Sequence, residues 1–370
     1  MWYFIIGALM LTFGGGLLYI SFRSARFSFV KRLTGNRRWL GRLLCLVFYL
    51  ALAVFLWRIW NLMNALVCFV HLFLFWLICD GIGAVICKVR HTKPERYRAG
   101  AAAFFLCILY LAAGWYADHH VWVRNYSFTT DQFEGSLRIV QLTDSHLGAT
   151  FDAEGFGQYI DEINALSPDV VVVTGDFVDD DTSREDMLGG CEALGQLKTK
   201  YGVYFVYGNH DMGYFSEAAK GWKNAELQNA LEQNGVVILE DEPVTLFDGV
   251  VLAGRRDRSY DRNDRSRLTA EALLRDVEKE NYVILLDHQP YDFDAEAEAG
   301  ADLVLCGHTH GGQFIPINYV GEWTGENCLR YGHEKRGDTD FIVSSGISNW
   351  TFRFKTGCWS EYVVVDIRGS

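Results

Sequence analysis

Four apolar runs in the first 117 residues constrain this chain more than any other feature of its sequence. They cover roughly residues 2–21, 39–57, 65–87 and 99–117. Each is close to the ~20 residues that a helix needs to cross about 30 Å of hydrocarbon. The first run lacks a basic leader and a small-residue cleavage site, so we expect it to be retained as a span. The sequence therefore predicts a region of four transmembrane helices over residues 1–117.

The basic residues between these runs predict how the region is oriented. Six follow the first run between Arg23 and Arg38, and five follow the third between Lys88 and Arg98, whereas Arg58 alone separates the second run from the third. Lys and Arg concentrate in cytoplasmic loops. We therefore expect a multi-pass plasma-membrane protein in which everything after residue 118 lies outside the cytoplasm.

Two ionisable residues, His71 and Asp80, lie inside the third run. Such residues raise the hypothesis of transport, because charge is costly to bury in lipid. They are nine residues apart, however, which places them on opposite faces of a helix. A role in helix packing or at the interface is therefore favoured over transport.

The rest of the chain is strongly acidic. The whole chain carries 46 acidic and 34 basic residues. Its first 100 residues hold two acidic and 13 basic residues, so the last 270 hold 44 acidic and 21 basic residues. Such a domain repels the phosphates of nucleic acids, and a nucleic-acid partner is excluded. The nine cysteines show no CxxC spacing, which argues against a zinc knuckle. A disulfide between Cys328 and Cys358 is the less favoured alternative to free thiols.

Short β-branched runs alternate with helical stretches after residue 130, which indicates a layered α/β domain. The expected strands cover residues 137–143, 169–175, 202–207, 235–240, 243–253, 282–287, 302–306, 341–345 and 360–367, and the expected helices cover 153–166, 184–199, 223–233 and 269–279. We expect a membrane domain over 1–117, a linker over 118–135 and an α/β domain over 136–370.

Metal-competent side chains follow five of these expected strands. The segments are Asp144-Ser145-His146, Gly175-Asp176-Phe177-Val178-Asp179, Gly208-Asn209-His210-Asp211, Asp287-His288 and Gly307-His308-Thr309-His310. Sites in α/β domains gather at the carboxyl ends of strands. One such residue alone is more often a cap or a turn residue, but five strand ends of this kind indicate a common site. The glycines at 175, 208 and 307 allow the backbone to approach it closely.

The order DxH, GDxxD, GNHD, H and GHTH resembles the calcineurin-like metallophosphoesterase superfamily over residues 137–367. The resemblance implies an α/β/β/α sandwich with a two-metal centre. The implied ligands are Asp144, His146 and His310 for one metal ion, and Asn209, His288 and His308 for the other, with Asp176 bridging the two.

The resemblance also implies roles for two residues that do not bind metal. His210 would protonate or stabilise the leaving alkoxide, and Asp179 would orient its imidazole. The alternative for Asp179 and for Asp211 is to cap a helix or to solvate a turn.

The chemistry of the implied ligands agrees with this family. Mixed oxygen and nitrogen ligands without cysteine suit two divalent ions of Mn, Fe or Zn. Two such ions, roughly 3.5–4 Å apart, can deprotonate a bridging water and neutralise phosphoryl oxygens during in-line attack. The implied activity is metal-dependent hydrolysis of a phosphoric ester, without a covalent phosphoenzyme.

The segment Gly307–Gln313, GHTHGGQ, is similar to the bacterial membrane-associated branch of the family, some members of which act on lipid-linked phosphodiesters or pyrophosphates. Asp180 and Asp181 follow the GDxxD motif where the protein-phosphatase branch has Arg and Gly, which argues against that activity. We therefore expect a phosphorylated lipid or small molecule as the substrate. No protein partner can be inferred.

The sequence leaves two alternative roles open for each of two groups of side chains. Arg255, Arg256 and Arg258 face a substrate phosphate or form a salt-bridged loop with Asp257. The tryptophans that are either interfacial anchors or core residues are Trp122, Trp222, Trp323, Trp350 and Trp359.

Two other functions remain open from the sequence. One is a phosphomonoesterase or nucleotide phosphodiesterase that acts on soluble extracellular substrates. The other is an inactive phosphoesterase fold that serves as a membrane receptor or scaffold, which is disfavoured because every expected ligand position holds a competent residue.

Overall fold

The computed structural model describes residues 2–92, 97–214, 217–259, 267–315 and 317–370. The chain divides into two compact units, Met1–Ala113 and Gly114–Ser370.

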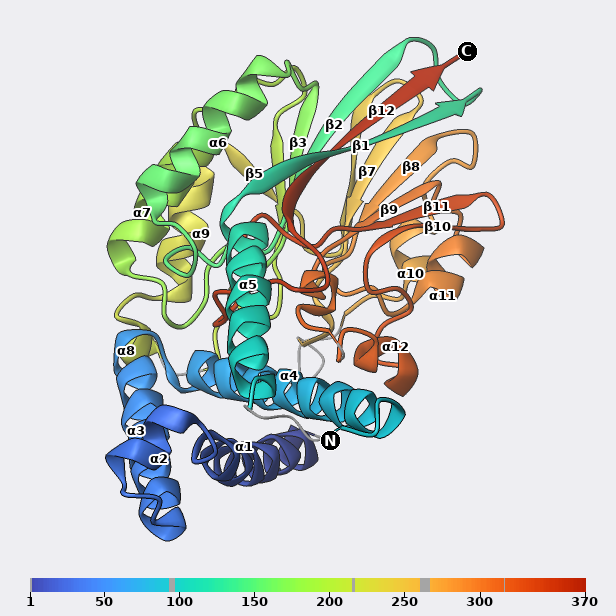
Figure 1. Ribbon diagram of the computed structural model, residues 1–370. Helices are drawn as coiled ribbons and strands as arrows, with labels where there is room; N and C mark the ends of the chain where they lie inside the picture. The colour runs from blue at the N-terminus through green and yellow to red at the C-terminus, as the bar shows by residue number, and fades with distance from the viewer. Residues whose placement is uncertain (1, 93–96, 215–216, 260–266, 316) are drawn as a thin grey trace. The chain divides into compact units, whose positions relative to one another are not determined.

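The amino-terminal unit is helical (Figure 1). Its helices are α1 (Trp2–Ser24), α2 (Ser28–Leu33), α3 (Arg38–Ile59), α4 (Leu62–Val89) and α5 (Ala99–His119), whose last six residues belong to the second unit. Among the described residues, α3, α4 and α5 are long and apolar enough to cross a membrane. Three candidate spans are therefore found, not the four expected. The first run forms α1, several of whose side chains lie outside the described part, and its role as a span stays a prediction.

The ionisable residues of α4 take part in helix packing. Asp80 accepts hydrogen bonds from the hydroxyls of Tyr19 at 2.6 Å and Tyr97 at 2.8 Å, and it pairs with Arg23. His71 Nδ1 bonds to a carbonyl of its own helix at 2.8 Å, and its ring lies 5.5 Å from that of Tyr110 in α5. These contacts favour the packing role over a transport role.

The first sheet of the carboxyl-terminal unit has six strands in the order β1-β12-β2-β3-β4-β5. They are β1 (Val121–Thr130), β2 (Ser136–Leu142), β3 (Val170–Thr174), β4 (Val203–Val206), β5 (Val236–Ile238) and β12 (Ser360–Gly369). The strands β2 to β5 are parallel, and β12 runs antiparallel to β2. Every residue of β3 is buried, as is typical of a central strand covered on both faces.

The second sheet also has six strands, in the order β10-β11-β9-β8-β7-β6. They are β6 (Glu242–Phe247), β7 (Val250–Gly254), β8 (Tyr282–Leu286), β9 (Leu303–Cys306), β10 (Gly332–Arg336) and β11 (Thr339–Val343). The central four are parallel, and β6 and β10 are antiparallel edge strands.

Helices cover the outer face of each sheet (Figure 1). The first sheet carries α6 (Ala153–Ala165), α7 (Arg184–Leu194) and α9 (Asn224–Gln233), and the second carries α10 (Ala270–Leu274) and α11 (Phe293–Glu298). Asp152, Ser183 and Thr269 begin α6, α7 and α10 by accepting a hydrogen bond from a backbone N–H of the first turn. The short helices α8 (Glu217–Lys220), η2 (His310–Gly312) and α12 (Val320–Thr324) lie in connections.

Three buried clusters separate these layers. One lies between the first sheet and its helices and includes Phe156 and Phe177. A second lies between the two sheets and includes Val172 and Leu305, and a third lies under α10 and α11. The layers confirm an α/β sandwich domain with two mixed sheets.

The segment 118–135 differs from the expected linker. Its residues 121–130 form β1, which pairs in parallel with β12 from Val121↔Ser360 to Thr130↔Gly369. Five of the ten residues of β1 are exposed, so the strand lacks the apolar run that marks a central strand. Because α5 ends at His119, only His120 separates this candidate span from the sheet.

Candidate metal centre

The carboxyl ends of five parallel strands bring the metal-competent segments together. β2, β3 and β4 of the first sheet lead into the segments that start at Thr143, Gly175 and Tyr207, and β8 and β9 of the second sheet lead into those at Asp287 and Gly307. Backbone hydrogen bonds join these segments. For example, Asp144 N donates to the carbonyl of Gly175 at 3.0 Å, and Gly307 N donates to that of His288 at 3.0 Å.

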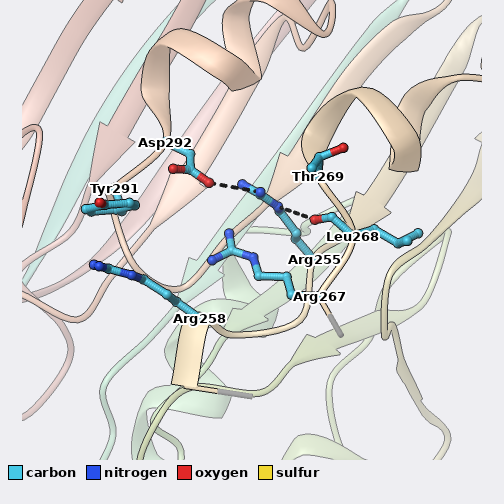
Figure 2. Close-up of a pocket in the computed structure, with 7 residues that line it drawn as sticks. All are labelled: Arg255, Arg258, Arg267, Leu268, Thr269, Tyr291 and Asp292. Atoms are coloured by element: carbon cyan, nitrogen blue, oxygen red, sulfur yellow. Dashed lines mark hydrogen bonds and ion pairs between the residues drawn. The ribbon is translucent and has the colours of Figure 1, made fainter. Parts of the chain in front are cut away.

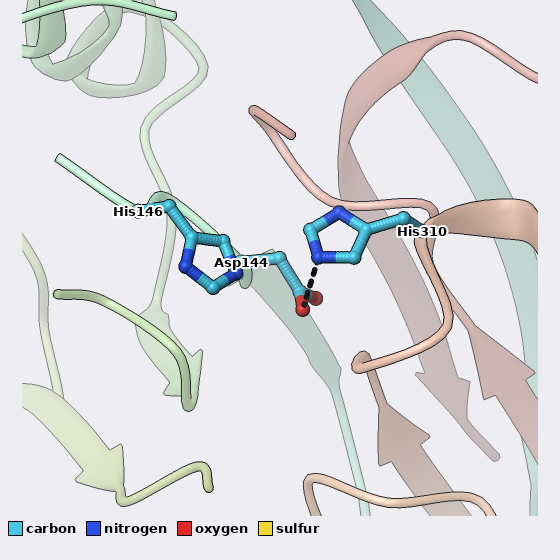
Figure 3. A group of neighbouring side chains, drawn as sticks. All are labelled: Asp144, His146 and His310. Carbon is cyan, nitrogen blue, oxygen red and sulfur yellow. Dashed lines mark ion pairs between the residues drawn. The ribbon is translucent and has the colours of Figure 1, made fainter. Parts of the chain in front are cut away.

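The first group of candidate ligands is Asp144, His146 and His310. Their ligand atoms lie within 4.8 Å of one another, and all three side chains are buried. Figure 3 shows both imidazoles beside the Asp144 carboxylate, with His310 Nε2 3.5 Å from Oδ1. One carboxylate and two imidazoles thus converge on a single point.

The second group is Asp176, His288 and His308, whose ligand atoms also lie within 4.8 Å of one another. Nε2 of His288 is 3.1 Å from Asp176 Oδ2 and 3.2 Å from Oδ1 of Asn209. The same Asp176 oxygen is 3.7 Å from Nε2 of His146, a member of the first group. Asp176 therefore faces both groups.

Two ring nitrogens in these groups fit a cation better than a hydrogen-bond partner. His146 Nε2 and His308 Nδ1 are buried and find no hydrogen-bond partner within the described ranges. Buried polar atoms are normally satisfied, and one left without a partner is costly. The residues present therefore fit two divalent metal ions with mixed nitrogen and oxygen ligands.

The opposite nitrogens of two candidate ligands are held by the protein. His288 Nδ1 donates to the Thr174 carbonyl at 2.7 Å, and His146 Nδ1 donates to Asp179 Oδ2 at 3.2 Å. A proton held at Nδ1 leaves the Nε2 lone pair directed at the metal position.

The contact between Asp179 and His146 corrects the expectation that Asp179 orients His210. The His146 backbone is left-handed, with φ 38°, which turns the residue toward the neighbouring segment after β3. The His210 ring instead lies against the rings of His146, Tyr214 and Trp350, with centroids 5.1, 5.0 and 5.0 Å away.

Asp211 organises the backbone around Asp176. Its buried carboxylate accepts hydrogen bonds from four backbone N–H groups, those of Gly208 at 2.7 Å, Phe177 at 2.8 Å, Asp176 at 2.9 Å and Val178 at 3.1 Å. The alternative that Asp211 holds a turn is therefore the one that the structure supports.

The backbone of the candidate ligands is strained. Asp144, His146, Asp176, His308 and His310 have φ values of 54°, 38°, 52°, 71° and 47°. A non-glycine residue in this region costs about 1–3 kcal/mol and persists only where the surroundings enforce it, often at functional sites. Close packing around the ligands enforces this backbone conformation. A Cβ on Gly208 would lie 2.3 Å from Asp176 Oδ1, and one on Gly307 would lie 2.3 Å from Asp144 Oδ2.

The electrostatics of the second group favour a bound cation. Burial and the charge of His288 lower the pKa of His308 to about 4, so its imidazole is neutral. Burial opposes ionisation of Asp176, but the charges of His288 and His210 outweigh it and hold the pKa of Asp176 well below its usual range. Burial likewise opposes a charged His288, and Asp176 outweighs it and raises the pKa of His288. A metal ion competes with that proton for the same lone pair.

The arginines after β7 contact other side chains of the protein. Arg255 is buried and lies 3.2 Å from Asp287, 2.9 Å from Asp292 and 3.1 Å from Glu296. Figure 2 shows its guanidinium reaching Asp292 and the carbonyl of Leu268. Arg255 is therefore salt-bridged, but it is buried and its partners are these three acidic residues rather than Asp257.

The flanking arginines are engaged as well. Arg258 stacks on the ring of Tyr291 at 3.5 Å, and Arg256 lies 3.6 Å from Glu240. Neither side chain reaches a candidate ligand of the metal centre in the contacts described.

Cys328 and Cys358 are free thiols. Cys328 Sγ donates to the Tyr291 carbonyl and Cys358 Sγ donates to that of His310, each at 3.0 Å. The less favoured disulfide is therefore not formed.

Sequence reasoning missed Tyr214. Its hydroxyl accepts a hydrogen bond from Asn209 Nδ2 at 2.8 Å, which leaves Asn209 Oδ1 toward His288. The only sequence feature that pointed to Tyr214 as a site residue was its position four residues after His210. The direction of its side chain depends on the turn after β4, which the sequence does not specify.

The family model of calcineurin-like phosphoesterases matches residues 137–312. A zebrafish (Danio rerio) transmembrane protein with metallophosphoesterase domain is 35% identical over 50% of this chain and 42% of its own length. The cattle (Bos taurus) protein of the same name is 31% identical over 61% of this chain and 52% of its own. An uncharacterized metallophosphoesterase of Aquifex aeolicus is 30% identical over 58% of this chain and 80% of its own.

The chain thus spans about half the length of the two animal relatives and most of the bacterial one. Relatives named as transmembrane proteins and three apolar helices associate the chain with a membrane. On the family model, the bacterial relative and the gathered ligand groups, this chain belongs to the calcineurin-like metallophosphoesterase family.

Proposed function

We propose that the protein is a membrane-anchored phosphoesterase that uses two divalent metal ions to hydrolyse phosphodiester or pyrophosphate bonds. The observation that carries the proposal is the position of Asp176, whose Oδ2 lies 3.1 Å from His288 Nε2 and 3.7 Å from His146 Nε2. One carboxylate that faces both ligand groups would be placed to bind two metal ions.

In this proposal each metal ion has its own ligands. Asp144, His146 and His310 hold one ion, Asn209, His288 and His308 hold the other, and Asp176 is shared. Two such ions, when bound, supply Lewis acidity to the phosphoryl group and activate water at neutral pH.

The protein's own groups keep this centre rigid. Thr174 and Asp179 fix the rings of His288 and His146. The His308 N–H, 3.0 Å from each oxygen of the Asp144 carboxylate, fixes that carboxylate. Preorganised ligands need little rearrangement during the reaction, which lowers its barrier.

His210 is the proposed proton donor to the leaving group. Its backbone N–H donates to Asp176 Oδ1 at 2.8 Å, which holds the residue beside the centre. Burial lowers the pKa of His210, so its protonated imidazole is a stronger acid than a free one and gives up its proton more readily.

We further propose that the catalytic domain lies outside the cytoplasm. The basic residues of the two loops support this orientation, because the six from Arg23 to Arg38 lie at or before the start of α3 and the five from Lys88 to Arg98 lie before α5. The substrate would then be met at the outer surface, as a lipid-linked or a small phosphorylated molecule.

A second candidate is a phosphomonoesterase or nucleotide phosphodiesterase acting on soluble substrates. One observation favours it. Tyr214 and Trp350 both pack against His210, at 5.0 Å each, and aromatic rings in that position would stack on a base.

The preference between diester and monoester separates these candidates. Protein purified in detergent and loaded with Mn²⁺ is assayed with bis(p-nitrophenyl) phosphate and with p-nitrophenyl phosphate, with His210→Ala as the control. Faster turnover of the diester, lowered about 10²–10⁴-fold by His210→Ala, is expected. Preference for the monoester would favour the second candidate, and no activity with any divalent metal would favour a receptor or scaffold.

A further inference from the structure

The connection after the candidate ligand His310 and the residue that precedes β12 carry exposed apolar side chains, which we name the apolar rim. It consists of Ile315, Ile317, Tyr319, Trp323 and Trp359, which are 47%, 51%, 41%, 75% and 41% exposed. These five make up half of the large hydrophobic side chains that are exposed in the described residues from 121 onward. Single exposed side chains are ordinary, but a gathered group marks an interaction surface.

The rim is joined to the metal centre. Arg330 donates to the Gly311 carbonyl and to the Tyr319 hydroxyl, each at 3.0 Å, and its guanidinium stacks on the Tyr319 ring. Cys358, beside Trp359, donates to the carbonyl of the candidate ligand His310. A surface that contacts the rim therefore lies next to the metal centre.

The rim is also joined to the last turns of α5, within the carboxyl-terminal unit. Lys355 N donates to the Gly114 carbonyl at 3.0 Å, and Ile315 N donates to Thr356 Oγ1 at 3.1 Å. A Cβ on Gly114 would lie 2.8 Å from Thr356 Cγ2, so this segment packs directly on the helix.

This contact places the rim near the level at which α5 leaves the hydrocarbon. Gly114 precedes the helix end at His119 by five residues, which is about 7.5 Å along the axis. The interfacial layer on each side of a bilayer is about 5–7 Å thick. The segment packed on Gly114 therefore lies at the depth of the headgroups rather than above them.

Aromatic rings connect the helix to the rim at the same level. Trp115 and Tyr116 of α5 are 46% and 56% exposed. The ring of Trp122 lies 5.8 Å from that of Tyr116 and 5.9 Å from that of Trp359. Trp and Tyr are the residues enriched where a membrane protein meets the headgroups.

From these contacts we infer that the apolar rim lies in the interfacial layer of the bilayer that α5 crosses, and that the metal centre takes phosphorylated lipid headgroups from that surface. The choice of substrate rests on the proposed function. The contact with the bilayer does not, because it follows from the rim and α5 alone.

Photo-crosslinking of the full chain in lipid nanodiscs tests the contact. p-Benzoylphenylalanine replaces Ile317 or Trp323, and Val237 serves as the matched control, because it is 45% exposed and lies on β5, at the opposite edge of the first sheet from β1. Lipid adducts at 317 and 323 are expected to exceed those at 237 about tenfold. Equal yields at the three positions, or adducts to protein in place of lipid, would overturn the inference.

Hydrolysis tests the choice of substrate separately. The double variant Ile317→Ser, Trp323→Ser is compared with Val237→Ser on soluble bis(p-nitrophenyl) phosphate and on hexadecyl p-nitrophenyl phosphate in phosphatidylcholine vesicles. Only the rim variant is expected to lose kcat/KM on the vesicle diester, about fivefold, with the soluble diester unchanged. An equal effect on both diesters would overturn the lipid assignment. Lipid adducts from a protein that hydrolyses neither diester would leave the bilayer contact standing and the proposed function wrong.

Discussion

Asp179 Oδ2 lies 3.2 Å from Nδ1 of His146, so this carboxylate orients a candidate metal ligand and not the proposed proton donor His210. Two further contacts fix Asp179 itself, since its backbone N–H donates to Thr182 Oγ1 and its Oδ1 accepts from the Asp181 N–H, at 2.9 and 2.8 Å. Partners of this kind fix the orientation of the ligand and support tight metal binding.

Asp179→Asn is therefore expected to weaken metal binding about 10–100-fold. The measurement is the Mn²⁺ concentration that half-saturates activity, with calorimetric titration of Mn²⁺ beside it. Asp181→Asn is the matched control, because Asp181 is exposed and lies in the same turn. Loss of turnover at unchanged Mn²⁺ affinity would instead indicate that Asp179 orients His210.

Gly208→Ala is expected to abolish tight metal binding, because the new Cβ would lie 2.3 Å from Asp176 Oδ1 and 2.4 Å from its backbone nitrogen. Asp176 and Asn209 would both have to move. Gly157→Ala is the control. It lies in α6 with open space around its Cβ position, and it is expected to stabilise the fold by about 0.5–1 kcal/mol. The metal content of the protein after dialysis measures the effect. A Gly208→Ala protein that retains as much metal as the wild type would contradict the packing described.

Arg255→Ala is expected to destabilise the domain by about 1–3 kcal/mol, because it removes the buried guanidinium that donates to Asp287 and Glu296, while Arg267 still pairs with Asp287. Arg184→Ala breaks the exposed pair with Glu226 and is expected to change stability by less than about 1 kcal/mol. Denaturant unfolding of the detergent-purified protein measures both. Unchanged stability together with a raised KM would instead indicate that Arg255 binds the substrate.

Glu361 predicts a pH dependence of stability. It is 1% exposed, and burial raises the pKa of its carboxyl although the hydroxyl of Tyr331 donates to it. The folded protein thus holds this proton more tightly than the unfolded chain does. The stability that results is complete below the ordinary pKa of 4.5 and is lost as the pH rises through the raised value.

Glu361→Gln removes this loss. The variant's free energy of unfolding, relative to that of the wild type, is expected to increase from about pH 4 to about pH 8. Exposed Glu280→Gln is the control. A difference that does not change with pH would contradict the burial argument.

The convergence of the candidate ligands was predictable from the sequence. All of them follow strands, and the carboxyl ends of parallel strands share one edge of a sheet, so Asp144, Asp176 and Asn209 had to meet. The layered α/β class followed from the same alternation of strands and helices.

Other features depended on information that is not local. The segment expected as one strand over 243–253 is the hairpin of β6 and β7, folded at Asp248-Gly249, where Gly249 has φ 81°. The Asp-Gly pair carried that signal, but the apolar residues on both sides masked it. β1 owes its strand conformation to pairing with β12, more than 200 residues away. The partner of Asp179 depends on the left-handed backbone at His146, which no local pattern specifies.

The central claim is that Asp176 joins two metal ions into one hydrolytic centre. Its most direct test measures the Mn²⁺ content and bis(p-nitrophenyl) phosphate hydrolysis of the purified full chain beside Asp176→Asn. The account predicts two ions per chain and metal-dependent hydrolysis in the wild type, with the variant retaining its fold, binding fewer ions and losing about 10³-fold or more in turnover. Hydrolysis that survives Asp176→Asn, or a wild-type protein that binds a single ion at full activity, would contradict it.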